Sequence, residues 1–290
     1  MKQKIKFFFF GFGQTAKYLV KRLIKSNKKF TFSATNTKKT SLLNFNKRKF
    51  KSFKFKNGSY DRKLLEELQE ADYILISIPP KKNEDLVLKK FSKILKKSNF
   101  IKLIYLSATS VYGNHDGRWV NENSKLKGKT LFGLGRKVAD KAWSNFRKQS
   151  GLDINILRVS GIYSKENNVL KKILKTNIYV KEKKYFSRIR VEDLAIVIEK
   201  MFFSSRKSMT LNAADDEPST NIEVAYYAAQ LLKLKHLKAK PISKFKNKMI
   251  REFYKDSKKV SNKKMKKQLK IKLKYPNYKV GLRNIFNNFS

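Results

Sequence analysis

The chain has 290 residues, of which 41% are hydrophobic and 31% are charged, so it can bury a sizeable core and is too apolar for wholesale disorder. It contains no cysteine and only two histidines, which excludes disulfides, thiolate metal sites, cysteine nucleophiles and histidine-rich metal sites. We therefore expect no metal site.

The charge is strongly positive, because 69 lysines and arginines stand against 22 acidic residues, a formal charge of +47. Such a charge attracts nucleic acid, anionic lipid or polyphosphate ligands. The lysines lie in every segment, and lysine, asparagine, phenylalanine, isoleucine and tyrosine are abundant together. This pattern favours compositional drift over a dedicated polyanion site, since such sites concentrate their charge on one face. We expect nucleic acid to bind only weakly and non-specifically, and no membrane partner.

The first residues superficially resemble a signal peptide, with a basic start followed by the apolar run Phe7–Phe10. This run is short and is broken by Gly11 and Gly13, and no apolar run approaches the ~20 residues of a membrane span. A buried strand that leads into a glycine turn explains the segment better. We expect a cytoplasmic protein.

Short β-rich runs alternate with helical stretches through the first two hundred residues. The pattern predicts strands over 5–10, 30–34, 50–55, 73–78, 101–106 and 154–159. It predicts helices over 15–25, 64–69, 86–95 and 132–147, and later a helix over 191–203 and a strand over 210–212. Thr220 and Glu223 form a capping box at the start of a helix that continues to Leu232. Alternation of apolar strands with helices indicates an α/β fold, a parallel sheet with helices on both faces.

A glycine-rich turn joins the first strand to the first helix. It has the form G-x-G-x-x-A and contains Gly11, Gly13, Gln14, Thr15 and Ala16. The first glycine permits a tight turn, the second lets the backbone approach a pyrophosphate, and the small last residue allows close helix packing. The position between strand and helix favours dinucleotide binding, while a simple connecting turn stays the alternative.

The end of the second predicted strand selects the ribose of such a cofactor. An acidic residue there accepts hydrogen bonds from the 2′-hydroxyl of NAD, but this chain has Thr35, Asn36, Thr37, Lys38 and Lys39 instead. Hydroxyl, amide and ammonium donors suit a 2′-phosphate, which favours NADP over NAD. In so lysine-rich a chain, incidental surface lysines are the alternative.

The segment 104–113, IYLSATSVYG, resembles the strand-five signature of extended short-chain dehydrogenases/reductases, the NAD-dependent epimerase/dehydratase family. Further pieces in the same order resemble an atypical, YeeZ-like branch of that family. They are SIPP at 77–80, WVNE at 119–122, LRVSGIY at 157–163, FSRIRVED at 186–193, NAADDEP at 212–218, VSN at 260–262 and YP at 275–276.

The resemblance implies a doubly wound Rossmann-type sheet that binds a nicotinamide dinucleotide, with cofactor contacts from Ser77, Pro79 and Ser107. It implies an NAD(P)-binding Rossmann-type domain over 1–162 and a smaller C-terminal substrate lobe over 163–290. Within that lobe, residues from about 191 to 213 return to the Rossmann core.

The family also uses a catalytic serine, tyrosine and lysine, and here those positions fall on Ala108, Phe132 and Arg136. Phenylalanine has no hydroxyl and cannot act as a general acid or base, and arginine stays protonated. Ser107 and Tyr112 are candidate replacements, although each has a structural role as its alternative.

Two functions therefore stay open. One is an active oxidoreductase or epimerase that acts on a sugar-nucleotide-like or other carbonyl/alcohol substrate. The other is a non-catalytic dinucleotide sensor or binding module. A nucleic-acid-associated protein is a third possibility, supported only by the net charge, and the substrate and oligomeric state stay open.

For three further features we favour a structural interpretation over a functional one. The segment 47–56 mixes lysines with phenylalanines as a single-strand nucleic-acid platform does, but a strand with buried aromatic residues explains it as well. The acidic run Asp215–Glu217 is typical of a solvated turn rather than a cation site. His115 follows the Tyr112-Gly113 turn, where a proton donor is conceivable, but a lone loop histidine is more often incidental.

Overall fold

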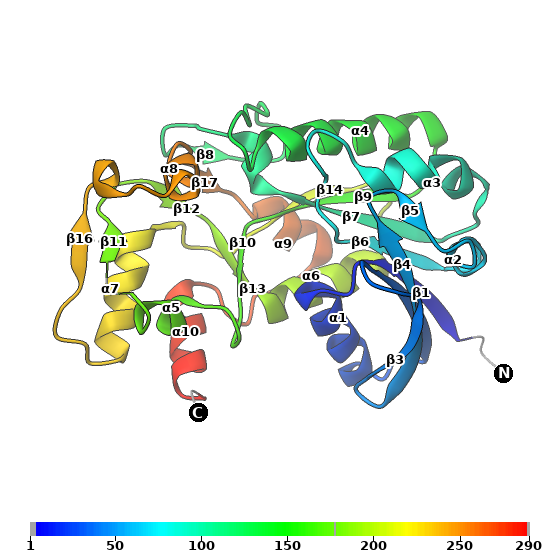
Figure 1. The fold of residues 1–290 in the computed structure, drawn as a ribbon, viewed down its shortest axis with the longest axis horizontal. Coiled ribbons are helices and arrows are strands. Elements are labelled where there is room, and N and C mark those ends of the chain that lie inside the picture. Colours follow the sequence, from blue (N-terminus) through cyan, green and yellow to red (C-terminus); the bar gives the residue numbers. More distant parts are fainter. Residues whose placement is uncertain (1–3, 177, 289–290) are drawn as a thin grey trace. The chain divides into compact units, whose positions relative to one another are not determined.

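The computed structural model describes residues 4–176 and 178–288 (Figure 1). The chain divides into two compact units, each built from separate segments. The first unit contains Met1–Ser107, Val138–Leu157 and Ala195–Thr210. The second contains Ala108–Lys137, Arg158–Leu194 and Leu211–Ser290. The expected boundary at residue 162 stays a prediction.

A nine-stranded sheet is the central feature of the fold. Its path runs β14-β9-β7-β6-β1-β2-β4-β3, with β5 paired to β4. The strands are β1 (Ile5–Phe10), β2 (Phe30–Asn36), β3 (Ser41–Phe45), β4 (Arg48–Lys56), β5 (Ser59–Tyr60), β6 (Tyr73–Ile76), β7 (Lys102–Ala108), β9 (Ile154–Val159) and β14 (Thr210–Ala213). The pairs β1–β2, β1–β6, β2–β4 and β6–β7 are parallel. The predicted α/β class with a doubly wound, Rossmann-type sheet is confirmed.

The order of the strands determines where a ligand can bind. Strand β1 lies between β2 and β6, so the chain leaves β1 toward one edge of the sheet and later returns to build the other. Open α/β sheets bind ligands beyond the carboxyl ends of the strands at such a switch point. Here the loop after β1 and the segment after β6 meet, since the Ser77 N–H donates to the Phe10 carbonyl at 3.0 Å.

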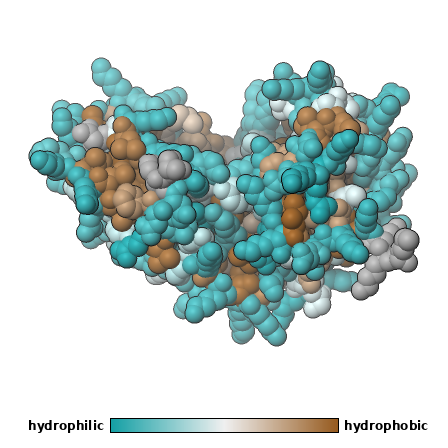
Figure 2. Space-filling view, turned by 90° about the horizontal axis from the view of Figure 1, so that it is seen from below, coloured by the Kyte–Doolittle hydropathy of each residue, from teal (hydrophilic) through white to brown (hydrophobic). Residues whose placement is uncertain are grey.

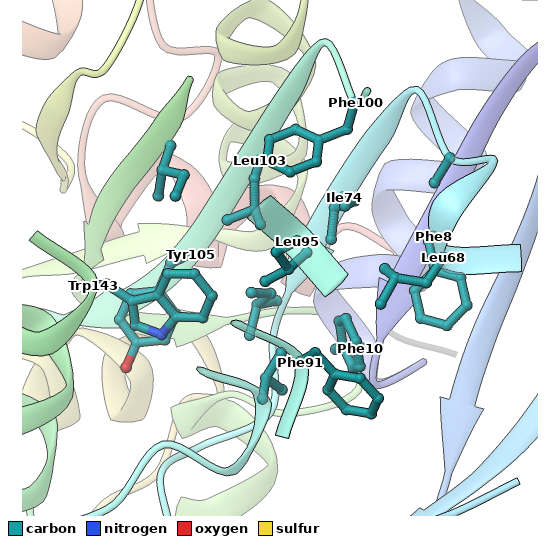
Figure 3. Close-up of a cluster of buried hydrophobic side chains, with 14 of the residues drawn as sticks. Phe8, Phe10, Leu68, Ile74, Phe91, Leu95, Phe100, Leu103, Tyr105 and Trp143 are labelled. Atoms are coloured by element: carbon teal, nitrogen blue, oxygen red, sulfur yellow. The ribbon is translucent and has the colours of Figure 1, made fainter. Parts of the chain in front are cut away.

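Helices cover both faces of this sheet. They are α1 (Gln14–Lys25), α2 (Leu64–Gln69), α3 (Leu86–Lys97), α4 (Leu134–Ser150) and α6 (Val191–Phe202). Phe8 and Phe10 of β1 pack in one cluster with residues of α2, α3 and α4, including Trp143 (Figure 3). Phe7 points to the opposite face, where its ring lies 5.5 Å from that of Phe202 in α6. The two faces explain why β1 is apolar at every position from 7 to 10, because side chains alternate along a strand.

The third predicted strand is confirmed as β4, and its aromatic residues face the core. Phe50, Phe53 and Phe55 are buried, while the lysines between them are exposed. The preferred interpretation of the segment 47–56 is therefore correct. The structure adds an antiparallel partner, β3, that the sequence analysis missed. Leu42 and Leu43 of β3 are exposed at the end of the sheet path, so this strand has no buried apolar face that a pattern would reveal.

The second unit contains four small strand pairs. They are β10 (Gly161–Tyr163) with β13 (Arg188–Arg190), β11 (Ile178–Val180) with β16 (Lys238–Lys240), β12 (Tyr185–Phe186) with β15 (Ser219–Thr220), and β8 (Trp119–Val120) with β17 (Lys259–Val260). Its helices are α5 (Val169–Ile173), α7 (Asn221–Leu231), α8 (Lys248–Phe253), α9 (Lys263–Leu269) and α10 (Tyr278–Phe286), with 3₁₀ turns at Thr109–Tyr112 and Ile242–Lys244.

The core of the second unit joins α5, α7 and α10, which lie together in Figure 1. The predicted capping box opens α7, because the Thr220 hydroxyl accepts from the Glu223 N–H and the Glu223 carboxylate accepts from the Thr220 N–H. Gly281 of α10 lies against Tyr163, and a Cβ at Gly281 would be 2.0 Å from the Tyr163 hydroxyl oxygen. Glycine is therefore required there by close packing.

Hydrophilic residues cover most of the face shown in Figure 2, as the high lysine content leads one to expect. Apolar patches lie between them. None of the helices in the described residues is long and apolar enough to cross a membrane.

Candidate functional site

The turn after β1 is held in a conformation that requires glycine at its first position. Gly11 has a φ of +90°, a region that side chains rarely adopt. A Cβ there would lie 2.7 Å from Cγ2 of Ile78. The Gly11 N–H donates to the Thr35 hydroxyl at 2.9 Å, which ties the turn to the end of β2.

Gly13, two residues later, is a glycine for a different reason. It is the N-cap of α1 with an ordinary φ of −83°, and its side-chain position is open, since a Cβ would meet nothing within 4 Å. No side chain caps the helix at this position. The backbone conformation therefore does not require glycine at position 13. Because Gly13 has no side chain, space is left beside the first N–H groups of α1, and helix N-termini favour anions.

The remaining residues of the fingerprint support the helix. Gln14 is half-buried at the first position of α1, whereas Thr15 and Ala16 are buried. Ala16 is fully inaccessible, which agrees with the need for a small side chain where the helix packs on the sheet.

The polar residues at the end of β2 differ in their exposure to solvent. The Thr35 side chain is buried and bonded to Gly11. The Asn36 amide donates to the Lys39 carbonyl and to Ser52, and its oxygen accepts from the Lys38 N–H at 2.7 Å. Lys38 and Lys39 are exposed. The exposed side chains of this segment are therefore those of Thr37, Lys38 and Lys39, while Thr35 and Asn36 shape the turn.

Three further predicted cofactor residues follow other strands. The Ser77 hydroxyl lies 3.0 Å from the Phe10 carbonyl and 3.2 Å from the Gly11 carbonyl, so it braces the glycine turn. Pro79 is exposed. Ser107, at the end of β7, is buried and donates to the Asp140 carboxylate at 2.6 Å.

In the second unit, two of the positions to which the sequence resemblance assigns catalytic residues line one cavity. We call this cavity of about 350 Å³ the strand-end cavity, and both Ala108 and Phe132 belong to its wall. The Ser110 hydroxyl donates to the Phe132 carbonyl at 2.9 Å, which places the segment before α4 against the end of β7. Arg136 is half-buried in the first turn of α4. Ala108 and Phe132 thus face the same space, but neither side chain carries a hydroxyl.

Tyr112, considered as a replacement base, has a structural role. Its ring is fully buried, its hydroxyl donates to the Asn212 side chain at 2.7 Å, and the Arg158 guanidinium donates to the same hydroxyl at 3.0 Å. Burial raises the pKa of Tyr112 above its ordinary value, despite the opposing effect of Arg158. The raised pKa keeps the Tyr112 hydroxyl neutral, and both of its hydrogen bonds are made to protein groups. Tyr112 is therefore not a proton acceptor for a substrate.

A charged pair in the strand-end cavity was missed by the sequence analysis. Lys258 and Asp256 both line the cavity, and their Nζ and Oδ2 atoms lie 3.6 Å apart. Lys258 is only 8% exposed, and burial lowers its pKa below the ordinary lysine value although Asp256 opposes the shift. Burial likewise raises the pKa of Asp256, against the effect of Lys258. Buried lysines with lowered pKa values are candidates for proton transfer.

Arg188 forms another part of the same wall. Its Nη1 donates to the carbonyls of Phe186 and Ser219, and its Nη2 donates to the Asn221 side chain at 2.5 Å. Burial lowers the pKa of this guanidinium, and Asp215 is the main group that opposes the shift. Arg188 thus holds three neighbouring segments together while it faces the cavity.

The acidic run 215–217 differs from our expectation of a solvated turn. Asp215 is 1% exposed, and burial raises its pKa well above the ordinary value. Asp216 pairs with Lys266 and Glu217 with Lys279. Residues 4–176 and 178–288 contain no group of three or more potential metal ligands.

His115 makes an ordinary loop contact, since its Nε2 lies 3.2 Å from the Lys125 carbonyl oxygen.

Comparisons with known proteins agree with this fold. No protein-family model matches the chain, and no curated protein sequence matches it. A functionally unknown conserved protein from Silicibacter pomeroyi is 28% identical, with a TM-score of 0.85 over 98% of this chain and 99% of that chain.

Several enzymes share the fold at lower identity. The UDP-N-acetylglucosamine 4-epimerase from Bacillus cereus is 14% identical, with a TM-score of 0.76 over 98% of this chain and 99% of that chain. The dTDP-glucose 4,6-dehydratase from Bacillus anthracis, in complex with NAD, is 17% identical, with a TM-score of 0.78 over 98% of this chain and 96% of that chain. The chain therefore has the fold of epimerases and dehydratases of the NAD-dependent type.

Proposed function

We propose that this protein binds a nicotinamide dinucleotide at the Gly11–Gly13 turn and acts as an oxidoreductase or epimerase of the extended short-chain dehydrogenase/reductase type. The observation that supports this most is Gly13, whose backbone conformation suits any residue and whose missing side chain leaves open space at the start of α1. The structure of the Bacillus anthracis dehydratase with NAD bound supports the class of cofactor. Membership of the YeeZ-like branch is part of the proposal.

The residues of the turn fit such a cofactor. Gly11 turns the chain, Gly13 opens the N-terminus of α1 to a pyrophosphate, and the exposed Lys38 and Lys39 suit a 2′-phosphate. The preference for NADP over NAD follows from these lysines. A bound dinucleotide would supply the acceptor or donor of a hydride, and the protein would supply binding and proton transfer.

Lys258 is the proton-transfer group that replaces the missing tyrosine in this proposal. A neutral Lys258 amine accepts the proton of a substrate hydroxyl: the O–H bond breaks, an N–H bond forms, and an alkoxide and an ammonium group result. The reverse step returns the proton. Burial favours the neutral amine, and Asp256 stabilises the ammonium form once it has formed.

A non-catalytic dinucleotide sensor is the second candidate, because Ala108 and Phe132 bring no hydroxyl to the cavity. The variant Lys258→Met separates the two. An enzyme loses turnover of reduced dinucleotide in this variant and keeps dinucleotide affinity, measured by nicotinamide fluorescence. A sensor shows the same affinity in both proteins and no turnover in either, with any carbonyl or alcohol offered.

The central test is a titration with NADH and NADPH, followed by nicotinamide fluorescence and by the melting temperature. A ligand present at one hundred times its Kd stabilises the native state by about 2.7 kcal/mol, which a thermal melt resolves. We expect Gly13→Val to abolish binding in a folded protein, because the side chain fills the open space at the start of α1. Lys63→Val is the control, since Lys63 is the exposed N-cap of α2 and also makes no side-chain cap bond. Unchanged NAD(P)H affinity in folded Gly13→Val would remove the proposal.

Two weaker elements complete the proposal. The positive charge produces only weak, non-specific nucleic-acid binding, and the protein works in the cytoplasm. The dependence of nucleic-acid affinity on salt concentration tests whether this binding is weak and non-specific.

A further inference from the structure

A second cavity of the second unit differs in character from the strand-end cavity. It has a volume of about 550 Å³ and shares Gly161, Arg188, Asn221 and Phe253 with the strand-end cavity. A volume of this size is typical of small-molecule sites. We call it the apolar cavity, because of the side chains that line it.

Most of the lining is aliphatic or aromatic. Of the twenty lining residues that the structure describes, fourteen are of this kind, namely Ile162, Tyr163, Val169, Ile178, Tyr179, Val180, Val224, Phe245, Met249, Ile250, Phe253, Tyr254, Tyr278 and Leu282. No aspartate or glutamate lies among the twenty, and the cationic members are Lys172 and Arg188. Such a wall favours a ligand that is itself largely apolar.

Several polar groups of this cavity already have protein partners, whereas the buried Tyr179 hydroxyl has none among the described residues. Arg188 donates to two carbonyls and to the Asn221 side chain. The N-terminus of α7 is capped by the box of Thr220 and Glu223, and that of α5 by Asn168, whose side chain accepts from the Lys171 N–H. A diphosphate needs several cations or backbone N–H groups. Lys172 is the exposed cation of the lining, so the cavity is poorly equipped for such a ligand.

The rim of the cavity exposes apolar surface. Ile178 is 37% exposed, Phe253 43% and Met249 51%. The Phe253 ring stacks on Phe186, a residue of the strand-end cavity, with 4.5 Å between centroids and 15° between planes. The two cavities thus share an apolar part of their wall at Phe253, beside the polar Arg188 and Asn221. A ligand with an apolar body would cover these side chains and remove their apolar surface from water, which favours binding.

We propose that the apolar cavity binds the body of an apolar substrate, an aromatic or long aliphatic alcohol or the matching carbonyl compound, and not a nucleotide sugar. The reactive oxygen of this substrate lies in the strand-end cavity. The assignment of a reaction rests on the proposed function, but the binding of an apolar molecule does not.

The test measures binding of the neutral fluorescent probe N-phenyl-1-naphthylamine, which avoids the attraction of anionic dyes to so cationic a protein. Ile178→Lys and Met249→Lys place a charge at the rim and are expected to weaken probe binding at least tenfold. Val280→Lys is the matched control, because Val280 is 43% exposed in the same unit and does not line the cavity. It is expected to bind the probe as the unmodified protein does.

Competition then decides the class of ligand. Decanol is expected to displace the probe, and UDP-glucose at the same concentration is not. Displacement by UDP-glucose alone, or equal probe affinity in the rim variants and the control, would overturn the inference. NADH titration of the same samples separates this inference from the proposed function. A protein that binds the probe as expected but does not bind NADH refutes the proposed function and leaves this inference standing. A protein that binds NADH but shows the same probe affinity in the rim variants and the control refutes this inference and leaves the proposed function standing.

Discussion

The two glycines of the turn after β1 should differ strongly in how far the same substitution destabilises the protein. Gly11→Ala and Gly13→Ala each add one methyl group within the same six-residue fingerprint. At Gly11 the methyl meets a strained backbone with a φ of +90° and lies 2.7 Å from Cγ2 of Ile78 and 3.0 Å from the Ser77 hydroxyl oxygen. At Gly13 it enters open space on an ordinary backbone.

The expected magnitudes differ accordingly. Strain in a sparsely populated backbone region costs about 1–3 kcal/mol, and an extra methyl group in a filled space costs about 1–3 kcal/mol more. Gly11→Ala should therefore lower the free energy of unfolding by about 2–6 kcal/mol. Gly13→Ala should change it by less than about 1 kcal/mol, because a weaker N-cap is offset by reduced entropy of the unfolded chain.

Chemical unfolding followed by circular dichroism measures the difference. A loss of about 1 kcal/mol lowers the melting temperature by about 2–4 °C in proteins of 150–250 residues, so Gly11→Ala should melt roughly 4–24 °C lower. Gly13→Asp extends the series, since aspartate is a good N-cap but brings a negative charge to the place proposed for the pyrophosphate. It should keep stability and lose NAD(P)H affinity. Equal destabilisation by Gly11→Ala and Gly13→Ala would refute the reasoning.

Four further measurements test other parts of the molecule. Gly281→Ala should destabilise the protein by about 1–3 kcal/mol or more, since its methyl would lie 2.0 Å from the Tyr163 hydroxyl; the urea midpoint measures this, and an unchanged midpoint would contradict the packing of α10. Lys258 should react with acetic anhydride at lower pH than an ordinary lysine, because burial lowers its pKa and the reactive neutral amine therefore forms at lower pH. Mass spectrometry across a pH series measures acetylation of Lys258, and half-maximal acetylation at or above pH 10.5 would contradict the lowered pKa. Lys38→Asp with Lys39→Asp should move the preference from NADPH toward NADH, and an unchanged ratio of affinities would show that neither lysine contacts a 2′-phosphate. Nucleic-acid binding should weaken by about a thousandfold or more between 50 and 200 mM salt if six phosphates are contacted, while NADPH binding persists; sequence-selective binding at high salt would overturn this expectation.

Local patterns were sufficient for most of the first unit. The strands 5–10 and 154–159 and the helix 64–69 have the predicted bounds, because an apolar run or a helical period contains its own signal. The capping box at Thr220 was likewise readable, since its hydrogen bonds join residues three apart. Strand β3 was missed because its exposed leucines are stabilised by pairing with β4 and not by burial.

The site was only partly readable. The fingerprint predicted a turn with two glycines, and the structure separates them: the backbone of Gly11 requires glycine, whereas the side-chain position of Gly13 is open space. Asp215 was expected in a solvated turn, and its burial contradicts that expectation. Burial depends on which distant segments cover a residue, and no local pattern records it.

The sequence by itself determined the α/β class, the order of the main strands along the chain and the glycine turn after the first strand. These follow from periodicity and from backbone freedom, which are properties of neighbouring residues. Only the tertiary structure showed that Lys258 and Asp256 share a cavity with Ala108 and Phe132, and that apolar residues from five or more elements line a second cavity. In a chain with 69 lysines and arginines, one buried lysine has no sequence signature. Its lowered pKa arises from the exclusion of water by residues far away in the chain, and that exclusion exists only once the chain is folded.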